Sequence, residues 1–131
     1  MWTDPVADLL TRIRNGVRNH SKQVMVPHSG MKQSVCEVLR EEGFVADVER
    51  IPGKPRDMIR VSLKYGPRGE QVLNRIRRES KAGCRKYVAV DQIPRVLNGL
   101  GMAVLSTSRG VMSDRKCREQ KIGGELVCTV Y

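Results

Sequence analysis

The chain has 131 residues, of which 40% are apolar and 29% are charged, and this composition predicts a folded protein with a very polar surface. Its 24 Lys and Arg residues against 14 Asp and Glu residues give a net charge of +10 at pH 7, which favours nucleic acid as a partner. A membrane is disfavoured, because no run approaches the roughly 20 apolar residues of a spanning helix and the opening residues lack an export signal.

The first segment with a clear pattern is a helix that begins at Pro5. Asp4 can cap it, and proline is well suited to the first helical position because its missing N–H would be unpaired there anyway. Arg12, Arg14, Asn15 and Arg18 fall outside the apolar face of this helix and can contact a partner. The apolar residues at helical spacing form one stripe: Val6, Leu9, Leu10, Ile13 and Val17.

The rest of the first half predicts an α/β unit. Ser29 can cap its second helix and Gly43 can end it. The expected elements are a strand at 23–26, a helix at about 30–42 and strands at 44–51 and 58–65. On this helix Met31, Val35, Val38 and Leu39 are expected to lie on one face. In the last strand apolar and polar residues alternate, which indicates an antiparallel strand with one buried face.

The breaker-rich segment 66–69 is the best candidate for a boundary, which gives an N-terminal domain at 1–66 and a C-terminal domain at 67–131. Segment 72–76 fits a helix or a strand equally well. The further expected elements are a strand at 87–90, a short helix at 93–100 capped by Asp91, a strand at 102–105, a helical turn from Ser113 to about 120 and a strand at 125–130. The expected fold class is α+β: two small domains, an N-terminal helix-strand-helix-strand-strand unit and a mainly β C-terminal unit with a short helix.

Three features of the second half suit contact with RNA. The run STSRG at 106–110 supplies hydroxyls that both donate and accept hydrogen bonds, and Gly110 permits a tight turn. The run GGE at 123–125 allows close backbone approach and offers a carboxylate that can accept from base amines. Basic residues near Tyr87 offer phosphate neutralisation beside an aromatic face: Arg75, Arg77, Arg78, Lys81, Arg85 and Lys86.

None of these features identifies a function alone, because a hydroxyl-rich loop or a glycine pair is usually only a turn. An enzyme would use a serine or threonine of 106–108 as nucleophile and His28 or His20 as base, but no Gly-x-Ser-x-Gly elbow is present. The four cysteines form no metal-binding pattern with one another or with the two histidines, and they are expected to be reduced, mostly buried thiols. We therefore expect no catalytic site, metal or cofactor.

Several segments also match a known family in their residues and in their order along the chain. They are DPVADLLTRIRNG at 4–16, EEGF at 41–44, VLNGLG at 96–101, STSRGVM at 106–112 and GGELVC at 123–128. Together they resemble the bacterial-type eighth protein of the small ribosomal subunit. The likeness covers essentially the whole chain and is most specific in its last third.

The resemblance implies a structural protein of the cytoplasmic ribosome with no small-molecule substrate. It implies primary binding to the central domain of small-subunit ribosomal RNA at an irregular, bulged helix read largely through its minor groove. It also implies help in subunit assembly, contact with neighbouring small-subunit proteins and binding to a messenger of its own operon. The residues predicted to contact RNA are Ser106, Thr107, Ser108, Arg109, Gly124, Glu125, Tyr87 and Lys86 at the main site, and Thr3, Asn15 and Lys32 at a second surface.

The chain departs from the family pattern at four positions. Gly30, Val88 and Ala89 stand where members often carry basic residues, and Ala82 replaces a common proline. These departures concern secondary phosphate contacts and leave the main site intact. One alternative stays open, a general RNA-binding chaperone outside the ribosome, which would lose its RNA to an excess of unrelated tRNA.

Overall fold

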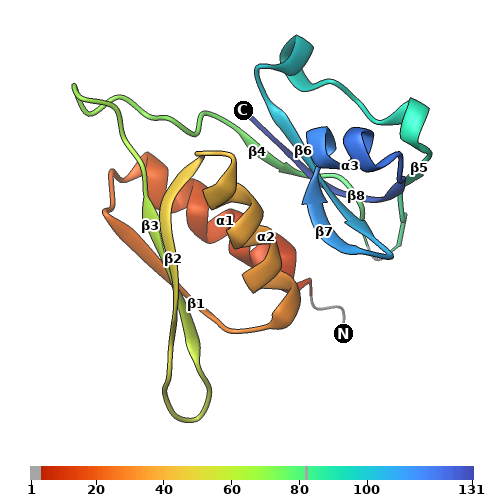
Figure 1. The fold of residues 1–131 in the computed structure, drawn as a ribbon. Coiled ribbons are helices and arrows are strands. Elements are labelled where there is room, and N and C mark those ends of the chain that lie inside the picture. Colours follow the sequence, from red (N-terminus) through yellow and green to blue (C-terminus); the bar gives the residue numbers. More distant parts are fainter. Residues whose placement is uncertain (1–3, 82) are drawn as a thin grey trace. The chain divides into compact units, whose positions relative to one another are not determined.

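The computed structural model describes residues 4–81 and 83–131, which form two compact units (Figure 1). One unit is Pro5–Asn74, and the other is Arg75–Tyr131 together with Asp4. The α+β fold class is confirmed, as is the element order predicted for the N-terminal half. The domain limits 1–66 and 67–131 stay a prediction.

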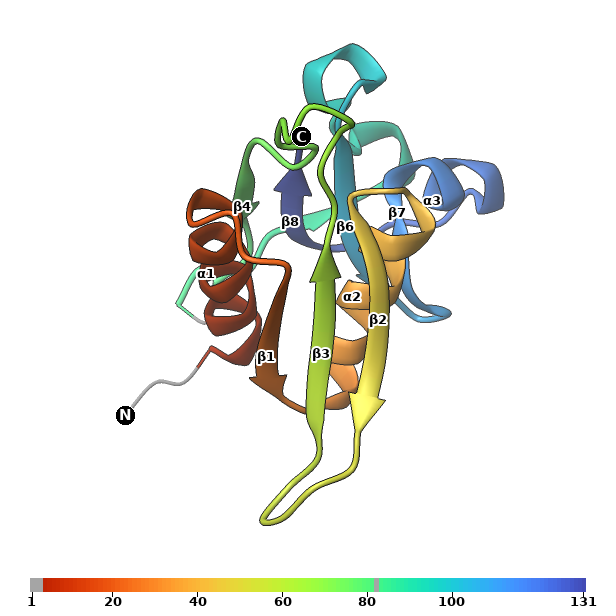
Figure 2. The same cartoon turned by 90° about the vertical axis from the view of Figure 1, so that its left-hand side faces the viewer.

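In the N-terminal unit, two helices lie on one face of a three-stranded antiparallel sheet (Figure 1). Its elements are α1 (Pro5–Arg18), β1 (Gln23–Pro27), α2 (Gly30–Glu41), β2 (Val45–Ile51) and β3 (Met58–Leu63). Strand β3 lies between β1 and β2 and pairs with both (Figure 2). The apolar stripe of α1 is buried in full, as predicted, and each such side chain contributes roughly 1.5–3 kcal/mol of hydrophobic stabilisation.

Helix α2 begins and ends close to the predicted residues. The Oγ of Ser29 accepts a hydrogen bond from the Lys32 N–H at 3.2 Å, and Gly43 adopts a φ of +83° just beyond the helix. Of the four residues expected on one face of α2, Val35, Val38 and Leu39 are buried, whereas Met31 is 39% exposed. Met31 lies in the first turn, where a helical side chain leans back past the helix start instead of over a preceding turn.

In the C-terminal unit, β8 (Gly124–Val130) is the centre of a five-stranded sheet. The other elements are β4 (Ile76–Arg78), β5 (Tyr87–Val88), short 3₁₀ turns at Val90–Gln92 and Val96–Gly99, β6 (Met102–Thr107), β7 (Gly110–Ser113) and α3 (Asp114–Gln120). Strand β6 pairs with one edge of β8 and carries β7 on its far side, while β4 and β5 pair with opposite ends of β8. The Oγ of Ser113 caps α3, as predicted.

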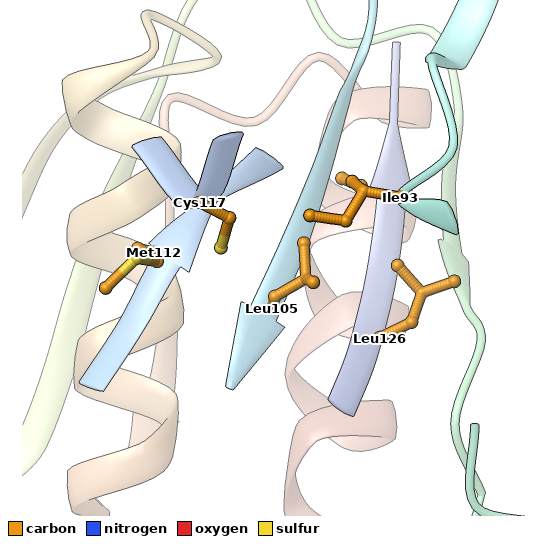
Figure 3. Close-up of a cluster of buried hydrophobic side chains, with 6 residues drawn as sticks. Ile93, Leu105, Met112, Cys117 and Leu126 are labelled. Atoms are coloured by element: carbon orange, nitrogen blue, oxygen red, sulfur yellow. The ribbon is translucent and has the colours of Figure 1, made fainter. Parts of the chain in front are cut away.

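A separate apolar core stabilises this unit. Figure 3 shows side chains of this core that come from the strands, from α3 and from the segment before β6. The buried members are Ile93, Ala103, Leu105, Met112, Cys117 and Leu126. This core supports the end of the sheet at which the predicted RNA-contact residues lie.

Two expectations for the C-terminal half were wrong. The helix at 93–100 is replaced by a 3₁₀ turn in which Leu97 and Asn98 have φ values of +47° and +55°. Pro94 accounts for this, because a residue that precedes proline disfavours the helical region, and Ile93 is extended. Strand β7 was not expected at all, and the ambiguous segment 72–76 contributes only Ile76 to a strand.

Candidate nucleic-acid interface

The predicted RNA-contact residues of the C-terminal half meet at one end of the sheet. Ser106 on β6 and Tyr87 on β5 both pair with Glu125 on β8. Residues directly opposite on antiparallel strands point to the same face, so these three side chains form a row. The adjacent pair, Leu105 and Leu126, belongs to the buried core. Because side chains alternate along a strand, the row lies on the face of the sheet away from that core.

We call the predicted residues gathered here the C-terminal polar patch; they are Lys86, Tyr87, Ser106, Thr107, Ser108, Arg109, Gly124 and Glu125. Tyr87 is 71% exposed, so its ring is accessible from solvent. Ser108 and Arg109 are exposed at the tip of the β6–β7 hairpin. Within the described residues, the guanidinium of Arg109 forms no ion pair and remains available for a phosphate.

The hairpin turn uses one of its three hydroxyls and presents the other two. The Oγ1 of Thr107 donates to the Gly110 carbonyl at 2.7 Å and accepts from the Arg109 N–H at 3.1 Å. Gly110 closes the turn with a φ of +107°. Among the residues that the structure describes, the hydroxyls of Ser106 and Ser108 have no hydrogen-bond partner. Thr107 therefore shapes the turn, and the two serines can bind a ligand.

The glycines before β8 allow close packing of the chain on itself. A Cβ on Gly124 would lie 2.4 Å from the carbonyl oxygen of Ser106 and 3.0 Å from the Cγ2 of Thr107. A Cβ on Gly123 would lie 2.4 Å from the carbonyl oxygen of Val88. The close backbone approach expected from the sequence is thus made to β5 and β6, and it brings Glu125 beside the hydroxyl-bearing hairpin.

The carboxylate of Glu125 is held by a small hydrogen-bond network. Its Oε2 accepts from the Oγ of Ser80 at 2.5 Å and from the Nη1 of Arg85 at 3.0 Å. Ser80 is fully buried and also accepts from the Lys86 N–H at 3.1 Å. These bonds fix the orientation of the carboxylate before any partner arrives and leave Oε1 for a partner.

Glu79 fixes the other side of the patch. Its Oε1 accepts from the Nζ of Lys86 at 3.1 Å, and its Oε2 accepts from the Oγ1 of Thr129 at 2.9 Å and lies 3.7 Å from the Nε of Arg77. Burial by itself would raise the pKa of Glu79, but these hydrogen bonds and the positive charges outweigh burial and lower the pKa below its ordinary value of 4.5. The carboxylate is therefore ionised at neutral pH and orients Lys86.

Arg78 is a structural residue, although it belongs to the basic run predicted to meet phosphates. Its Nε donates to the Oδ2 of Asp4 at 3.1 Å and its Nη1 to the Val127 carbonyl at 2.7 Å. Its side chain is only 13% exposed. A cation that is buried and already bonded twice has little left to offer a phosphate, so the basic run is less available than its sequence indicates.

Two of the three residues predicted for a second RNA surface, Asn15 and Lys32, fall on the N-terminal unit. Asn15 is exposed on α1, whereas Lys32 is buried in the first turn of α2. Burial lowers the pKa of Lys32, while the charge of Asp8 acts in the opposite direction. Thr3 lies outside the described residues. Of the two described residues of this set, Asn15 has an accessible side chain and Lys32 does not.

Sequence reasoning missed Ser80 and Glu79, the residues that orient the patch. The hydrogen bond from Ser80 to Glu125 joins positions 45 residues apart, and the bond from Thr129 to Glu79 joins positions 50 apart. No local pattern marks such partners, because their proximity follows from the pairing of β8 with β4 and β5.

The described residues show few alternatives to this interface. Across residues 4–81 and 83–131, His, Cys, Asp and Glu side chains form no group of three that could hold a metal ion. A separate finding is that no helix in the described part of the chain has the length and apolar character needed to cross a membrane. Cys36, Cys117 and Cys128 are buried, and Cys84 is exposed.

Comparison with known proteins then identifies the family. The model of a family described as Ribosomal protein S8 matches residues 4–131. The small ribosomal subunit protein uS8 of Anaeromyxobacter sp. (strain Fw109-5) is 52% identical over 130 residues, covering 99% of this chain and 98% of the relative. Proteins of the same name are 48% identical over 129 residues in Halothermothrix orenii, covering 98% of each chain, and 50% identical over 131 residues in Ligilactobacillus salivarius, covering 100% of this chain and 99% of the relative. The chain therefore belongs to the Ribosomal protein S8 family, whose members are non-enzymatic structural proteins of the small ribosomal subunit.

Proposed function

We propose that this chain binds the central domain of small-subunit ribosomal RNA through the C-terminal polar patch, and that this binding helps the subunit to assemble. The target is an irregular, bulged helix read largely through its minor groove. The observation that carries the proposal is the row of Tyr87, Glu125 and Ser106 on one face of the sheet, with Ser108 in the adjoining turn.

The chemistry of the patch suits this target. The minor groove of an RNA helix displays 2′-hydroxyls and base edges, and both need partners that donate as well as accept. The hydroxyls of Ser106 and Ser108 can do both, and Glu125 Oε1 accepts from exocyclic amines. A bulge exposes a base that can stack on the accessible ring of Tyr87. A regular duplex offers no such base, so the patch favours an irregular helix.

Positive charge attracts the protein to RNA in general, and the C-terminal polar patch then selects one RNA site. The net charge of +10 draws the protein to any RNA, and Arg109 and Lys86 place positive charge next to Ser108 and Tyr87 in the chain. Displacement of counterions makes this part of the binding strongly dependent on salt. The affinity should therefore fall steeply between 50 and 200 mM salt, while the preference for one RNA site persists.

The proposal also includes a second RNA contact, a messenger and protein neighbours. Asn15, whose side chain is exposed on the N-terminal unit, is a second RNA contact, and Lys32 and Thr3 stay predicted contacts. Because the patch recognises shape and hydroxyl groups, a messenger of the chain's own operon that folds into the same bulged helix would compete for it. Neighbouring small-subunit proteins are the other partners of an assembled subunit.

A serine substitution tests the main site. Ser108→Ala should weaken binding to a central-domain rRNA fragment about tenfold, because a hydroxyl that hydrogen-bonds RNA is lost, and should hardly change binding to a random duplex of equal length. Ser62→Ala, on β3 of the other unit, is the matched control and should bind like the wild type. Filter-binding titrations measure all three proteins. Equal losses on both RNAs would show that Ser108 is only structural.

Footprinting distinguishes ribosomal binding from general chaperone activity. The purified protein should protect one bulged helix of the central domain, and an excess of unrelated tRNA should leave that protection in place. A chaperone without a specific site would give diffuse protection and release its RNA to the tRNA.

A further inference from the structure

The N-terminal unit contains a polar pocket that the C-terminal polar patch does not explain. Its volume is about 310 Å³, and it lies between the second half of α1 and strand β1. Its polar side chains come from Arg12, Asn15, Asn19 and Ser21. Asn15 is already a predicted RNA contact and Arg12 was expected to face a partner, whereas Asn19 and Ser21 were assigned no function.

Close packing of the backbone forms the floor of the pocket. Gly16 lies between the polar residues of α1, and a Cβ there would lie 2.5 Å from the Cγ1 of Val24 and 3.0 Å from the Cδ1 of Leu63. The missing side chain therefore lets α1 approach β1 closely. Gly16 and Val24 therefore line the pocket together, beneath the polar side chains.

Arg12 is held in place before a ligand arrives. Its Nε donates to the Oδ2 of Asp8 at 3.1 Å, and its Nη1 donates to the carbonyl oxygen of Met25 at 3.0 Å. A guanidinium has five N–H groups, so three remain for a ligand. The side chain is 46% exposed. Because it is already ordered, binding an anion here costs less conformational entropy than binding to a free arginine.

The other polar groups have unused hydrogen-bonding capacity. Within the described residues, the side-chain amides of Asn15 and Asn19 and the hydroxyl of Ser21 have no hydrogen-bond partner. Their backbones are nevertheless fixed: the Ser21 N–H donates to the Gly16 carbonyl at 2.8 Å, and the Ser21 carbonyl accepts from the hydroxyl of Tyr65 at 2.6 Å. An ordered backbone with side chains that still have unused hydrogen-bonding groups is well suited to bind a ligand.

We propose that this pocket holds a single unpaired nucleotide of the bound RNA, with its phosphate on Arg12 and its base edge on the amides of Asn15 and Asn19. The inference rests on the proposed function, since it takes RNA as the ligand. A pocket of about 310 Å³ is at the small end of the range for ligand sites, which suits a single nucleotide.

The balance of donors and acceptors favours a nucleotide over an acidic peptide side chain. A carboxylate only accepts hydrogen bonds, so it would satisfy Arg12 but leave the amide oxygens of Asn15 and Asn19 without donors. A nucleotide brings an acceptor phosphate together with a base edge that both donates and accepts, which matches an asparagine amide. The pocket therefore extends the second RNA surface from a single contact to a small site.

The test blocks the pocket without touching the C-terminal polar patch. Asn19→Leu replaces an exposed amide by an apolar side chain of similar size, and Asn74→Leu makes the same change at an exposed position outside the pocket. The probe is a transcript of the central domain of small-subunit rRNA. Base-specific chemical modification, read at every nucleotide, locates contacts, and filter binding gives the dissociation constant.

We expect wild type and Asn74→Leu to protect one unpaired nucleotide outside the bulged helix. Asn19→Leu should leave that nucleotide reactive, keep the bulged-helix footprint and bind about tenfold more weakly, because hydrogen bonds to one base are lost. Arg12→Lys, which keeps the charge but loses the planar fork, should expose the same nucleotide and provides the test if Asn19→Leu fails to fold.

Three outcomes would overturn the pocket proposal. If Asn19→Leu and wild type give identical protection and affinity while the bulged-helix footprint persists, the pocket is empty and the C-terminal site still stands. If Arg12→Lys leaves the unpaired nucleotide protected and the affinity unchanged, Arg12 does not hold its phosphate and the pocket proposal fails. If wild type protects no bulged helix, the proposed function fails and takes the pocket with it.

Discussion

The two units hold their polar residues in opposite ways. In the C-terminal polar patch, Glu125 is fixed by Ser80 and Arg85, so the functional carboxylate is ordered by the protein itself. In the N-terminal pocket, the amides of Asn15 and Asn19 have no partner among the described residues and would be ordered by the ligand. Preorganised groups lose less entropy on binding and reject poorly fitting partners more sharply. The patch should therefore determine specificity, and the pocket should mainly add affinity.

The largest expected effect comes from the glycines that bring chain segments together. Gly124→Ala places a Cβ 2.4 Å from a backbone oxygen, and a strand backbone cannot easily move, so we expect a loss of about 2–3 kcal/mol in the free energy of unfolding. Gly16→Ala meets only the side chains of Val24 and Leu63, which can shift, and should cost roughly 1–2 kcal/mol. Urea denaturation measures both variants.

Gly30→Ala is the control for these glycines. No atom lies within 4 Å of a Cβ at Gly30, and alanine favours a helix, so this variant should be as stable as the wild type or slightly more stable. If Gly124→Ala were equally harmless, the close packing of β8 against β6 would not be what aligns Glu125 with the hairpin.

A smaller effect is expected where the network beneath the patch is cut. Ser80→Ala removes a fully buried hydroxyl that serves both Glu125 and the Lys86 N–H, so the protein should lose about 1–3 kcal/mol of stability. Binding to the central-domain fragment should weaken as well, because Glu125 is no longer held. Ser62→Ala serves as the matched change on the other unit, and thermal unfolding with filter binding compares the two. A Ser80→Ala protein that keeps full affinity would show that preorganisation is not the source of specificity.

The sequence predicts local features of this fold better than long-range ones. The stripe of α1, the cap at Ser29 and the cap at Ser113 depend on residues within one or two helical turns, and all were predicted. The helix at 93–100 was wrong because one proline outweighed a favourable composition. Strand β7 is four residues long and gains its stability from pairing with β6, which no local pattern reports.

The candidate site shows the same division. The runs at 106–110 and 123–125 were singled out from their residue types, and the structure brings them together. The roles of single residues could not be predicted. Thr107 shapes the turn, and Ser80, which is 45 residues away in sequence, orients Glu125. Arg78 also looked like a phosphate ligand until its bond to Asp4 was known. Residue types thus indicated the chemistry, and tertiary pairing decided which side chains are free to perform it.

A weaker effect should depend on pH. The pKa of Glu79 lies below 4.5 in the folded protein, so its interactions add stability that is fully present above that value and is lost as pH falls through the lowered pKa. Glu79→Gln should cost up to about 1 kcal/mol at pH 7, and its difference from wild type should shrink in acid. Urea denaturation at several pH values between 3 and 7 measures this. A difference that stays constant across that range would mean that the charge of Glu79 contributes nothing.

The smallest effect on stability is expected at the exposed cysteine, and it allows the two units to be compared directly. Cys84→Ser should change stability by less than about 0.5 kcal/mol, since the side chain is exposed. In the variant, the remaining thiols report on opening of each unit: burial raises the pKa of Cys36 to about 12 and that of Cys117 to about 11, so neither should react with a maleimide while its unit is closed. Adding Gly124→Ala should speed labelling of Cys117 and leave Cys36 unchanged, as followed by mass spectrometry. If Gly124→Ala speeded the labelling of Cys36 and Cys117 equally, the two units would open together. The contrast between a preorganised patch and an adaptable pocket would then not arise from separate stabilities of the two units.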